Sequence, residues 1–172
     1  MKEAEMLKQG KIGVMPTDTL YGLVASVSRK EAIKRVYDLK KRSSAKPSII
    51  LISSLGDLGA FGVVLTEGQR KVLARFWPGP VSIVLPCGIA FRLPNNTPLI
   101  SFLKESGPCI APSANPEGLP PAETIEEAKK YFGDKVDFYK DGGECSGGMP
   151  STLIALDEQG VIKVLRQGGT LI

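Results

Sequence analysis

The hydrophobic positions of the chain repeat at two different spacings. Five segments have helical spacing or helix end signals, namely residues 1–10, 28–42, 66–77, 98–105 and 124–134. Three of these helices are expected to begin with a side-chain cap, formed by Ser28 with Glu31, Thr66 with Gln69, and Thr124 with Glu127. Each cap would satisfy backbone N–H groups that the first helical turn leaves unpaired.

Short apolar runs between these helices predict strands. They cover residues 11–16, 47–54, 81–86, 89–94, 108–112, 136–140, 151–156 and 161–166. The run PSIILISS at 47–54 is typical of a strand that is covered on both sides. Helices and strands alternate early in the chain, and strands cluster late. We therefore expect one α/β domain over residues 1–172, with a sheet that is partly parallel and partly antiparallel.

The composition is that of an ordinary globular domain, with 42% hydrophobic and 23% charged residues. The net charge of +4 is compatible with acidic partners such as nucleotides or RNA, although many small domains are mildly basic for solubility alone. No apolar run reaches membrane-spanning length, no segment resembles a signal peptide, and the three cysteines form no CxxC pair. A protein of the reducing cytoplasm without membrane contact is expected.

The chain contains no histidine. This absence excludes Ser-His-Asp and Cys-His catalysis, HExxH metal sites and histidine as a general base. The cysteine spacing supports no zinc site, so no metal ligands are predicted in the protein itself. Any chemistry must therefore come from other side chains, from the backbone or from a bound metal.

Four loops place small or polar residues beside strand ends, where α/β proteins build ligand sites. They are PTDTLYG at 16–22, LKKRSSAKP at 39–47, APSANPEGLPP at 111–121 and DGGECSGGMPST at 141–152. Each loop also has a structural interpretation. The first and third contain turn-forming residues, and the glycines of the fourth suit either an anion or a flexible connection. The fourth loop matches neither the Walker nor the dinucleotide pattern.

The second loop carries four cations within nine residues. Residues 40–42 are expected in the last turn of a helix, where the helix dipole stabilises each cation by roughly 0.3–1 kcal/mol. That interpretation requires no ligand. However, Ser43, Ser44 and Lys46 extend the pattern beyond the helix. A short cluster of Arg, Lys and hydroxyl groups is suited to polyphosphate recognition.

Taken together, the motifs occur in one order: PTDTLYGL, K-x-R followed by KP, WPGP, RLP, APSAN with G-x-P after it, ST opening a late strand, and LR-x-G. Because it contains these motifs in this order, the chain resembles the threonylcarbamoyl-AMP synthase family, the YrdC-like proteins, from about Val14 to Gly168. The length resembles the short, single-domain form. The resemblance implies an open, twisted sheet of mixed parallel and antiparallel strands, with flanking helices, around a large electropositive cavity.

The same resemblance implies an activity. Members of the family join L-threonine, bicarbonate or CO2, and ATP into threonylcarbamoyl-adenylate and release pyrophosphate. A partner complex then transfers the threonylcarbamoyl group to an adenosine of tRNA. Mg²⁺ accompanying ATP is the expected cofactor, and direct binding of tRNA is left open.

Matching positions give two sets of expected site residues. L-Threonine would be bound by Thr19, Arg92, Ser113 and Ser151. ATP would be bound by Lys40, Arg42, Lys46, Asn115 and Arg166, with Lys40 and Arg42 as the catalytic pair. The sequence departs from the family pattern at Ser43, Pro150 and Gln167. Asp18 is a candidate Mg²⁺ ligand or a partner of a binding residue.

This chemistry agrees with the missing histidine. All three substrates carry negative charge, and two unit charges about 4 Å apart interact by roughly 4 kcal/mol at an effective dielectric of 20. Fixed cations, proximity and orientation could therefore drive the condensation without an enzyme nucleophile. No cysteine is expected to act covalently.

Three alternatives are weighed against this hypothesis. A double-stranded RNA or tRNA-binding module would use the same basic cavity, but the chain has only 6% aromatic residues and no recognised RNA-binding motif. A carbamoyltransferase-type nucleotide-binding domain would be expected beside cysteine-rich zinc motifs, which this sequence lacks. A purely structural basic domain would leave the co-occurring loop motifs unexplained.

Overall fold

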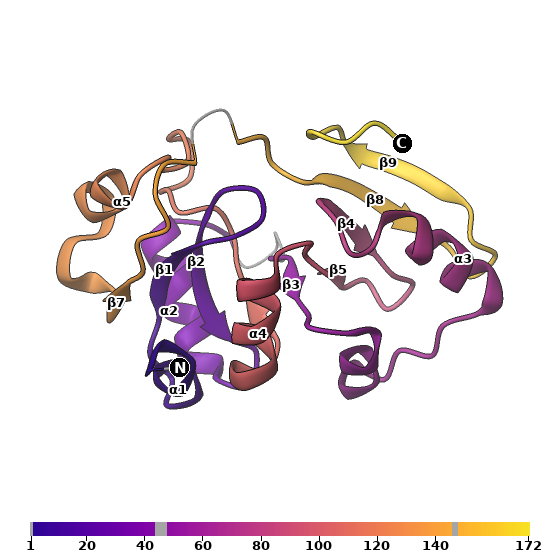
Figure 1. The fold of residues 1–172 in the computed structure, drawn as a ribbon, viewed down its shortest axis with the longest axis horizontal. Coiled ribbons are helices and arrows are strands. Elements are labelled where there is room, and N and C mark those ends of the chain that lie inside the picture. Colours follow the sequence, from indigo (N-terminus) through magenta and orange to yellow (C-terminus); the bar gives the residue numbers. More distant parts are fainter. Residues whose placement is uncertain (1, 44–47, 146–147) are drawn as a thin grey trace.

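The computed structural model describes residues 2–43, 48–145 and 148–172. Within these ranges, nine strands form one open sheet in the order β7-β1-β2-β6-β3-β5-β4-β8-β9 (Figure 1). The strands are β1 (Gly13–Pro16), β2 (Tyr21–Ser26), β3 (Ile50–Leu51), β4 (Val81–Val84), β5 (Ala90–Arg92), β6 (Cys109–Ile110), β7 (Phe138–Tyr139), β8 (Thr152–Leu156) and β9 (Ile162–Arg166).

Strand pairing confirms the expected mixed sheet. The pairs β1–β2, β2–β6, β3–β6, β4–β5 and β8–β9 are antiparallel. The pairs β1–β7, β3–β5 and β4–β8 are parallel. Strands β4 and β5 form one hairpin, β8 and β9 form another, and the long parallel pair β4–β8 joins them.

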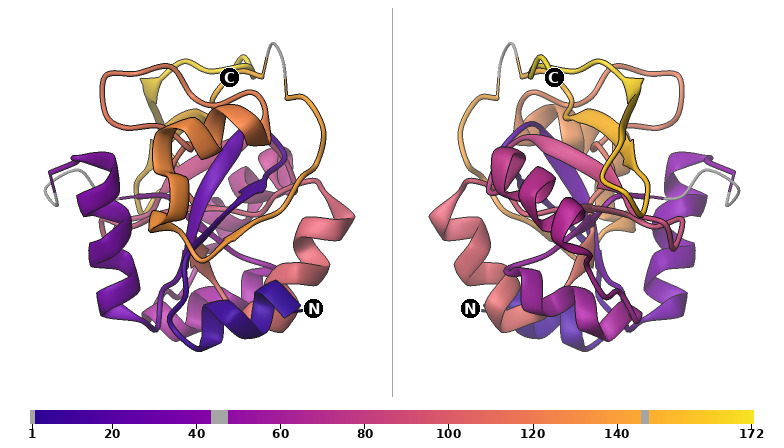
Figure 2. Two further views of the ribbon diagram at one scale, coloured as in Figure 1. Left: turned by 90° about the vertical axis from the view of Figure 1, so that its left-hand side faces the viewer. Right: turned by 90° about the vertical axis from the view of Figure 1, so that its right-hand side faces the viewer.

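Helices cover both faces of the sheet. They are α1 (Lys2–Lys8), α2 (Lys30–Lys40), α3 (Glu67–Phe76), α4 (Thr97–Ser106) and α5 (Ile125–Phe132), with 3-10 helices η1 (Leu55–Phe61) and η2 (Gly133–Lys135). Apolar residues of α1 and α4 share one core cluster, and those of α2, α3 and α5 share another. Figure 2 shows α2 and α4 on opposite sides of the sheet.

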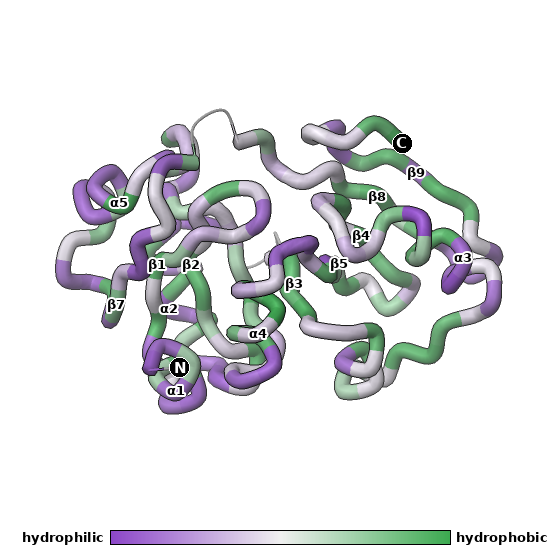
Figure 3. Tube along the Cα trace, viewed as in Figure 1, coloured by the Kyte–Doolittle hydropathy of each residue, from purple (hydrophilic) through white to green (hydrophobic). Residues whose placement is uncertain are grey.

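Alternating strand residues explain the two core clusters. Val14 and Leu23 belong to one cluster, whereas their neighbours Met15 and Val24 belong to the other. Successive side chains of a strand point to opposite faces, so a strand that is apolar throughout can supply two cores at once. Figure 3 shows this apolar character along the central strands, with hydrophilic residues more frequent on the helices.

Two helix starts confirm the predicted caps, and one does not. The hydroxyl of Thr66 accepts a hydrogen bond from the backbone of Gln69, and Thr124 accepts one from the backbone of Glu127. The cap predicted at Ser28 is wrong, because α2 begins at Lys30 without a side-chain cap. The Ser28 hydroxyl instead lies 2.9 Å from that of Ser26 at the end of β2, which offers it a nearer partner.

The sequence-based analysis also missed a strand. Residues 21–26 form β2, which begins with the last two residues of PTDTLYG, and all six are buried. Of the strand predicted at 47–54, Ile50–Leu51 forms β3, and Pro47 lies outside the described ranges. None of the helices in the described part of the chain has the length and apolar content of a membrane span.

Candidate active site

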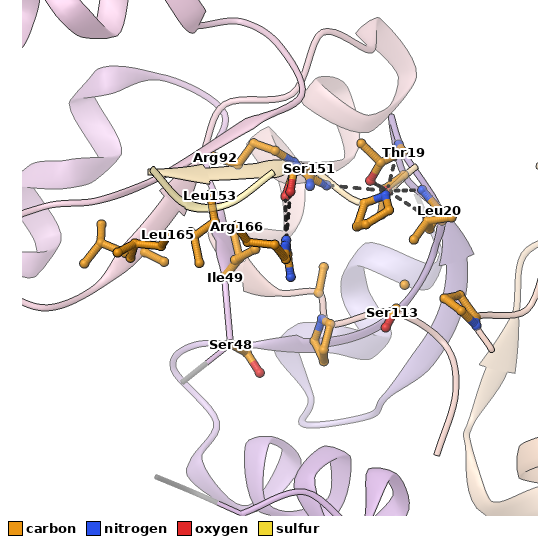
Figure 4. A pocket seen from close by; sticks show the side chains of 18 of the residues that line it. Thr19, Leu20, Ser48, Ile49, Arg92, Ser113, Ser151, Leu153, Leu165 and Arg166 are labelled. Atoms are coloured by element: carbon orange, nitrogen blue, oxygen red, sulfur yellow. Dashed lines mark hydrogen bonds between the residues drawn. The ribbon is translucent and has the colours of Figure 1, made fainter. Parts of the chain in front are cut away.

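A cavity of about 510 Å³ lies where the four loops come together, since each of them contributes lining residues. Strands β4, β5, β8 and β9 supply most of the rest of its wall, together with Ser48, Ile49 and Gly88. Six of the nine predicted site residues line it: Thr19, Arg42, Arg92, Ser113, Ser151 and Arg166. All of these except Arg42 are labelled in Figure 4. The residues come from distant parts of the chain, so only the folded sheet brings them together.

Backbone pairing joins the first and third loops. Ser113 forms an antiparallel bridge with Gly22, and the backbone N–H of Ala114 donates to the carbonyl of Tyr21 at 2.8 Å. This pairing continues the β2–β6 ladder beyond the end of β6, along the first residues of β2. The hydroxyls of Thr19 and Ser113 therefore line the same cavity because the sheet extends into the loops.

The first loop is a tight turn organised by Thr17. Its hydroxyl donates to the carbonyl of Leu20 at 2.7 Å and accepts from the backbone N–H groups of Thr19 and Leu20, both at 3.2 Å. A threonine that bonds to backbone two and three residues later is a common turn device. The turn fixes the backbone of Thr19, whose side chain lines the cavity.

Arg92 and Asp18 form a buried ion pair. The Nη2 atom of Arg92 lies 2.9 Å from Oδ1 of Asp18, and the two side chains are only 5% and 6% exposed. Burial lowers the pKa of Arg92, whereas the negative charge of Asp18 raises it. Beyond this ion pair, neither carboxylate oxygen of Asp18 has a hydrogen-bond partner in the described part of the chain. This geometry favours Asp18 as the partner of Arg92 over Asp18 as a Mg²⁺ ligand.

Lys40 does not line the cavity. It lies in the last turn of α2, as expected, but its side chain is buried, with only 3% of the residue exposed. Its ammonium group donates to the carbonyls of Ser113 and Asn115 at 2.5 and 2.7 Å and to Oδ1 of Asn115 at 3.3 Å. Burial and the nearby charge of Arg42 lower its pKa to about 8, which leaves it largely protonated at pH 7.

Asn115 lies behind the cavity wall, together with Lys40. Its side-chain amide donates to the carbonyls of Pro116 and Leu119 at 3.0 and 2.6 Å, and its Oδ1 accepts from the Ser113 hydroxyl at 2.6 Å. These bonds, with the one from Lys40, occupy the hydrogen-bonding groups of the amide. In this state Asn115 fastens the third loop, as the structural interpretation of that loop predicted.

Three arginines give the cavity a positive field. The guanidinium of Arg166 donates to the carbonyl of Ser151 at 2.8 Å, and its pKa is lowered first by burial and then by repulsion from Arg42. Arg166 in turn lowers the pKa of Arg92. Arg166 is thus repelled by Arg42 and itself repels Arg92, and Asp18 is the carboxylate that opposes these charges. An anionic ligand in the cavity would relieve this repulsion. Lys46, the fifth predicted ATP contact, lies outside the described residues.

Sequence analysis alone missed how the fourth loop is held. Tyr21 is fully buried, and its hydroxyl donates to the carbonyl of Gly143 at 2.7 Å and accepts from the N–H of Gly142 at 2.9 Å. A Cβ on Gly142 would lie 2.3 Å from a side-chain atom of Pro16. This glycine therefore allows close packing against the first loop, a reason that the glycine-rich composition could not reveal.

The C-terminal segment closes over the start of β8. Thr152 donates to the carbonyl of Thr170 at 2.6 Å and accepts from the N–H of Gly168 at 3.0 Å. Gln167, which departs from the family pattern, bonds through its side-chain amide to the carbonyl of Thr170 at 2.7 Å. These contacts hold the segment against Ser151 and so support one wall of the cavity.

A methyl group at Gly168 is expected to disrupt this wall. The Cβ of Gly168→Ala would lie 2.1 Å from the carbonyl oxygen of Pro150, so the backbone next to Ser151 must move. Overpacking of this kind typically costs about 1–3 kcal/mol of stability. Urea unfolding should show that loss, whereas Gly59→Ala, whose Cβ meets nothing within 4 Å, should unfold within about 1 kcal/mol of wild type. Equal stability of the two variants would contradict the packing described for this segment.

Comparison with known proteins matches this chain to a protein family. The family model named Sua5_yciO_yrdC, described as "Telomere recombination", matches residues 5–168. The threonylcarbamoyl-AMP synthase of Pyrococcus abyssi is 33% identical over 96% of this chain and 53% of its own length. That of Bacillus subtilis is 29% identical over 96% of this chain and 52% of its own length. The chain thus spans about half the length of these curated relatives.

Solved structures agree with the family match. The Pyrococcus abyssi Sua5 protein complexed with L-threonine superposes with a TM-score of 0.88 at 32% identity, over 98% of this chain and 53% of its own. Escherichia coli YciO superposes with a TM-score of 0.85 at 22% identity, over 98% of this chain and 88% of its own, and shows the fold alone. From its loops, its cavity and these matches, the chain belongs to the Sua5/YciO/YrdC family.

Proposed function

We propose that this protein is an L-threonylcarbamoyladenylate synthase, which condenses L-threonine, bicarbonate or CO2, and ATP and releases pyrophosphate. The observation that carries the proposal is the convergence of Arg42, Arg92 and Arg166 on one cavity that also contains the Thr19, Ser113 and Ser151 hydroxyls. The similarity to named threonylcarbamoyl-AMP synthases, and to a relative solved with L-threonine, supports the same reaction.

The proposed reaction requires charge neutralisation more than covalent catalysis. The threonine amine attacks the carbon of bicarbonate and a water molecule leaves, which gives N-carboxythreonine. The new carboxylate then attacks the α-phosphorus of ATP, and pyrophosphate leaves. Arg92, held by Asp18, would bind the threonine carboxylate, and Arg42 with Arg166 would bind phosphate oxygens. Thr19 and Ser113 would orient threonine. Bringing the substrates together in one cavity supplies proximity, and the fixed cations offset their mutual repulsion.

Lys40 is proposed to support ATP binding together with Arg42. In the present geometry its three N–H bonds are directed at oxygens of Ser113 and Asn115, so a phosphate oxygen would have to replace one of these acceptors. While these three bonds are intact, Lys40 and Asn115 support the cavity wall by holding the third loop in place.

Mg²⁺ would enter this site with ATP. Among the described residues there is no group of three or more His, Cys, Asp or Glu side chains that could hold a metal ion. Mg²⁺ usually keeps several waters and binds substrate phosphates with only one or two carboxylates, so a dedicated protein cage is not required. The ion would reduce the charge on the phosphates, and the arginines would hold the remaining oxygens.

The product itself tests the proposed function. The protein is incubated with ATP, Mg²⁺, L-threonine and ¹³C-bicarbonate, and the nucleotides are analysed by mass spectrometry. A threonylcarbamoyl-adenylate that carries the ¹³C label is expected, and in cells a transferase complex acting on tRNA would consume it. Salt-sensitive RNA binding without any such product would instead support the RNA-binding alternative.

A further inference from the structure

A buried serine lies directly behind the cavity wall. Ser82 is in the middle of β4 and is 0% exposed, between Val81 and Ile83 of the core. Its hydroxyl lies 2.8 Å from that of Ser151, which precedes β8 and lines the cavity. The parallel pairing of β4 with β8 sets this contact, because Val81 pairs with Thr152. Nothing in the apolar pattern of VSIVLP predicts a role for this serine.

A count of donors and acceptors assigns the direction of this hydrogen bond. A serine hydroxyl has one hydrogen to donate and two lone pairs that accept. Within the described residues, Ser151 is the hydrogen-bond partner of the Ser82 hydroxyl, and buried hydroxyls generally use their hydrogen. Ser82 therefore donates to Ser151.

The same count leaves one free hydrogen on Ser151. Its oxygen accepts from Ser82 at 2.8 Å and from Nη2 of Arg166 at 3.4 Å, so both lone pairs are used. No acceptor for the Ser151 hydrogen is found in the part of the chain that the structure describes. Figure 4 shows the Ser151 hydroxyl in the cavity wall near Arg92, with its oxygen pointing toward Arg166.

We infer that Ser82 is a positioning residue that makes the Ser151 hydroxyl a hydrogen-bond donor toward the cavity. This site then selects a ligand oxygen that only accepts, such as a carboxylate or carbamate oxygen, and disfavours a ligand N–H at the same place. The identity of the ligand as L-threonine or its N-carboxy derivative rests on the proposed function. The donor direction follows from the protein contacts alone.

The test compares three substitutions by calorimetric titration of L-threonine. Ser82→Ala should weaken threonine binding about fivefold, because Ser151 can then turn its hydrogen away from the ligand. In turnover assays its KM for threonine should rise by a similar factor, with kcat within about twofold of wild type. Ser82→Thr keeps a hydroxyl and should bind threonine within about twofold of wild type. Ser106→Ala removes a buried serine outside the cavity lining and should leave threonine binding unchanged.

A double-mutant cycle separates positioning from general destabilisation. In a Ser151→Ala background, Ser82→Ala should cause no further loss of threonine affinity, because the hydroxyl that Ser82 directs is gone. Two independent, additive losses would overturn the inference, as would wild-type affinity in the single Ser82→Ala variant. Thermal unfolding of each variant shows whether the protein remains folded at the titration temperature.

A second probe distinguishes failure of this inference from failure of the proposed function. If wild-type protein does not bind L-threonine, the proposed function is wrong, and inorganic pyrophosphate replaces threonine as the titrant. Its oxygens are also acceptors, so weaker pyrophosphate binding by Ser82→Ala would still support the donor role of Ser151. Unchanged pyrophosphate binding in that case would overturn it.

Discussion

Replacing Arg92 with methionine is expected to raise the threonine concentration needed for half-maximal turnover by about a hundredfold. The guanidinium is buried and lines the cavity, so the threonine carboxylate would lose a desolvated, charge-assisted partner. Truncating one side of a buried, hydrogen-bonded charge pair typically costs about 2–5 kcal/mol of binding energy. Pyrophosphate release measured over a range of threonine concentrations tests this expectation.

The buried ion pair calls for a matched control. Arg92→Met leaves Asp18 as an uncompensated charge, which commonly destabilises a protein by about 3–5 kcal/mol. The double variant Asp18→Asn with Arg92→Met removes that charge and should recover most of the lost stability in urea unfolding. It should not recover threonine affinity. If it binds threonine as well as wild type, Arg92 is a structural residue and its proposed role is wrong.

Arg42→Ala is expected to lose at least about tenfold in pyrophosphate release at saturating threonine. A hydrogen bond to a charged group is worth about 1.5–3 kcal/mol, and Arg42 is proposed to make such bonds to phosphate oxygens. Its side chain is only partly buried and lies beyond the end of α2, so the fold should be preserved. Initial rates over a range of ATP concentrations show whether the loss comes from ATP binding or from the chemical step.

Arg70→Ala provides the control for Arg42→Ala. Arg70 is an exposed arginine of α3 that does not line the cavity, so its removal lowers the net charge equally without changing the proposed site. Its rate should stay within about twofold of wild type. Near-normal pyrophosphate release by Arg42→Ala, or an equal loss in both variants, would refute the role assigned to Arg42.

The sequence predicted the architecture well where local signals and tertiary contacts agree. The Thr66 and Thr124 caps and the runs that form β4, β5, β8 and β9 were found because caps and short apolar runs depend on near neighbours in the chain. The Ser28 cap failed because Ser26 at the end of β2 competes for the same hydroxyl. Strand β2 was missed because it begins within a loop that was singled out for its polar groups.

The site was predicted only in part, for a different reason. The order of loop motifs identified side chains that meet in one cavity, but it could not tell which of them face the ligand. Lys40 and Arg42 are two residues apart, yet Arg42 lines the cavity whereas Lys40 is buried against the carbonyls of Ser113 and Asn115. Side-chain direction at the end of a helix is set by tertiary packing, so spacing alone does not determine it.

The contacts of Ser82 and Tyr21 also could not be predicted from the sequence. Ser82 belongs to no motif, and the PTDTLYG motif that contains Tyr21 does not show where its hydroxyl binds. Both hydroxyls bond to segments far away in the chain. Their partners, Gly143 and Ser151, were singled out from composition and from motif order. Only the sheet register shows which buried hydroxyl reaches them.

Pyrophosphate release under omission of single substrates tests the central claim most directly. The claim is that one cation-lined cavity allows threonine, bicarbonate and ATP to react together. Protein with ATP and Mg²⁺ is assayed in CO2-free buffer with both other substrates, without threonine, and without bicarbonate. Release should occur only when threonine and bicarbonate are both present. Release that continues unchanged when either is omitted would contradict the proposed synthase.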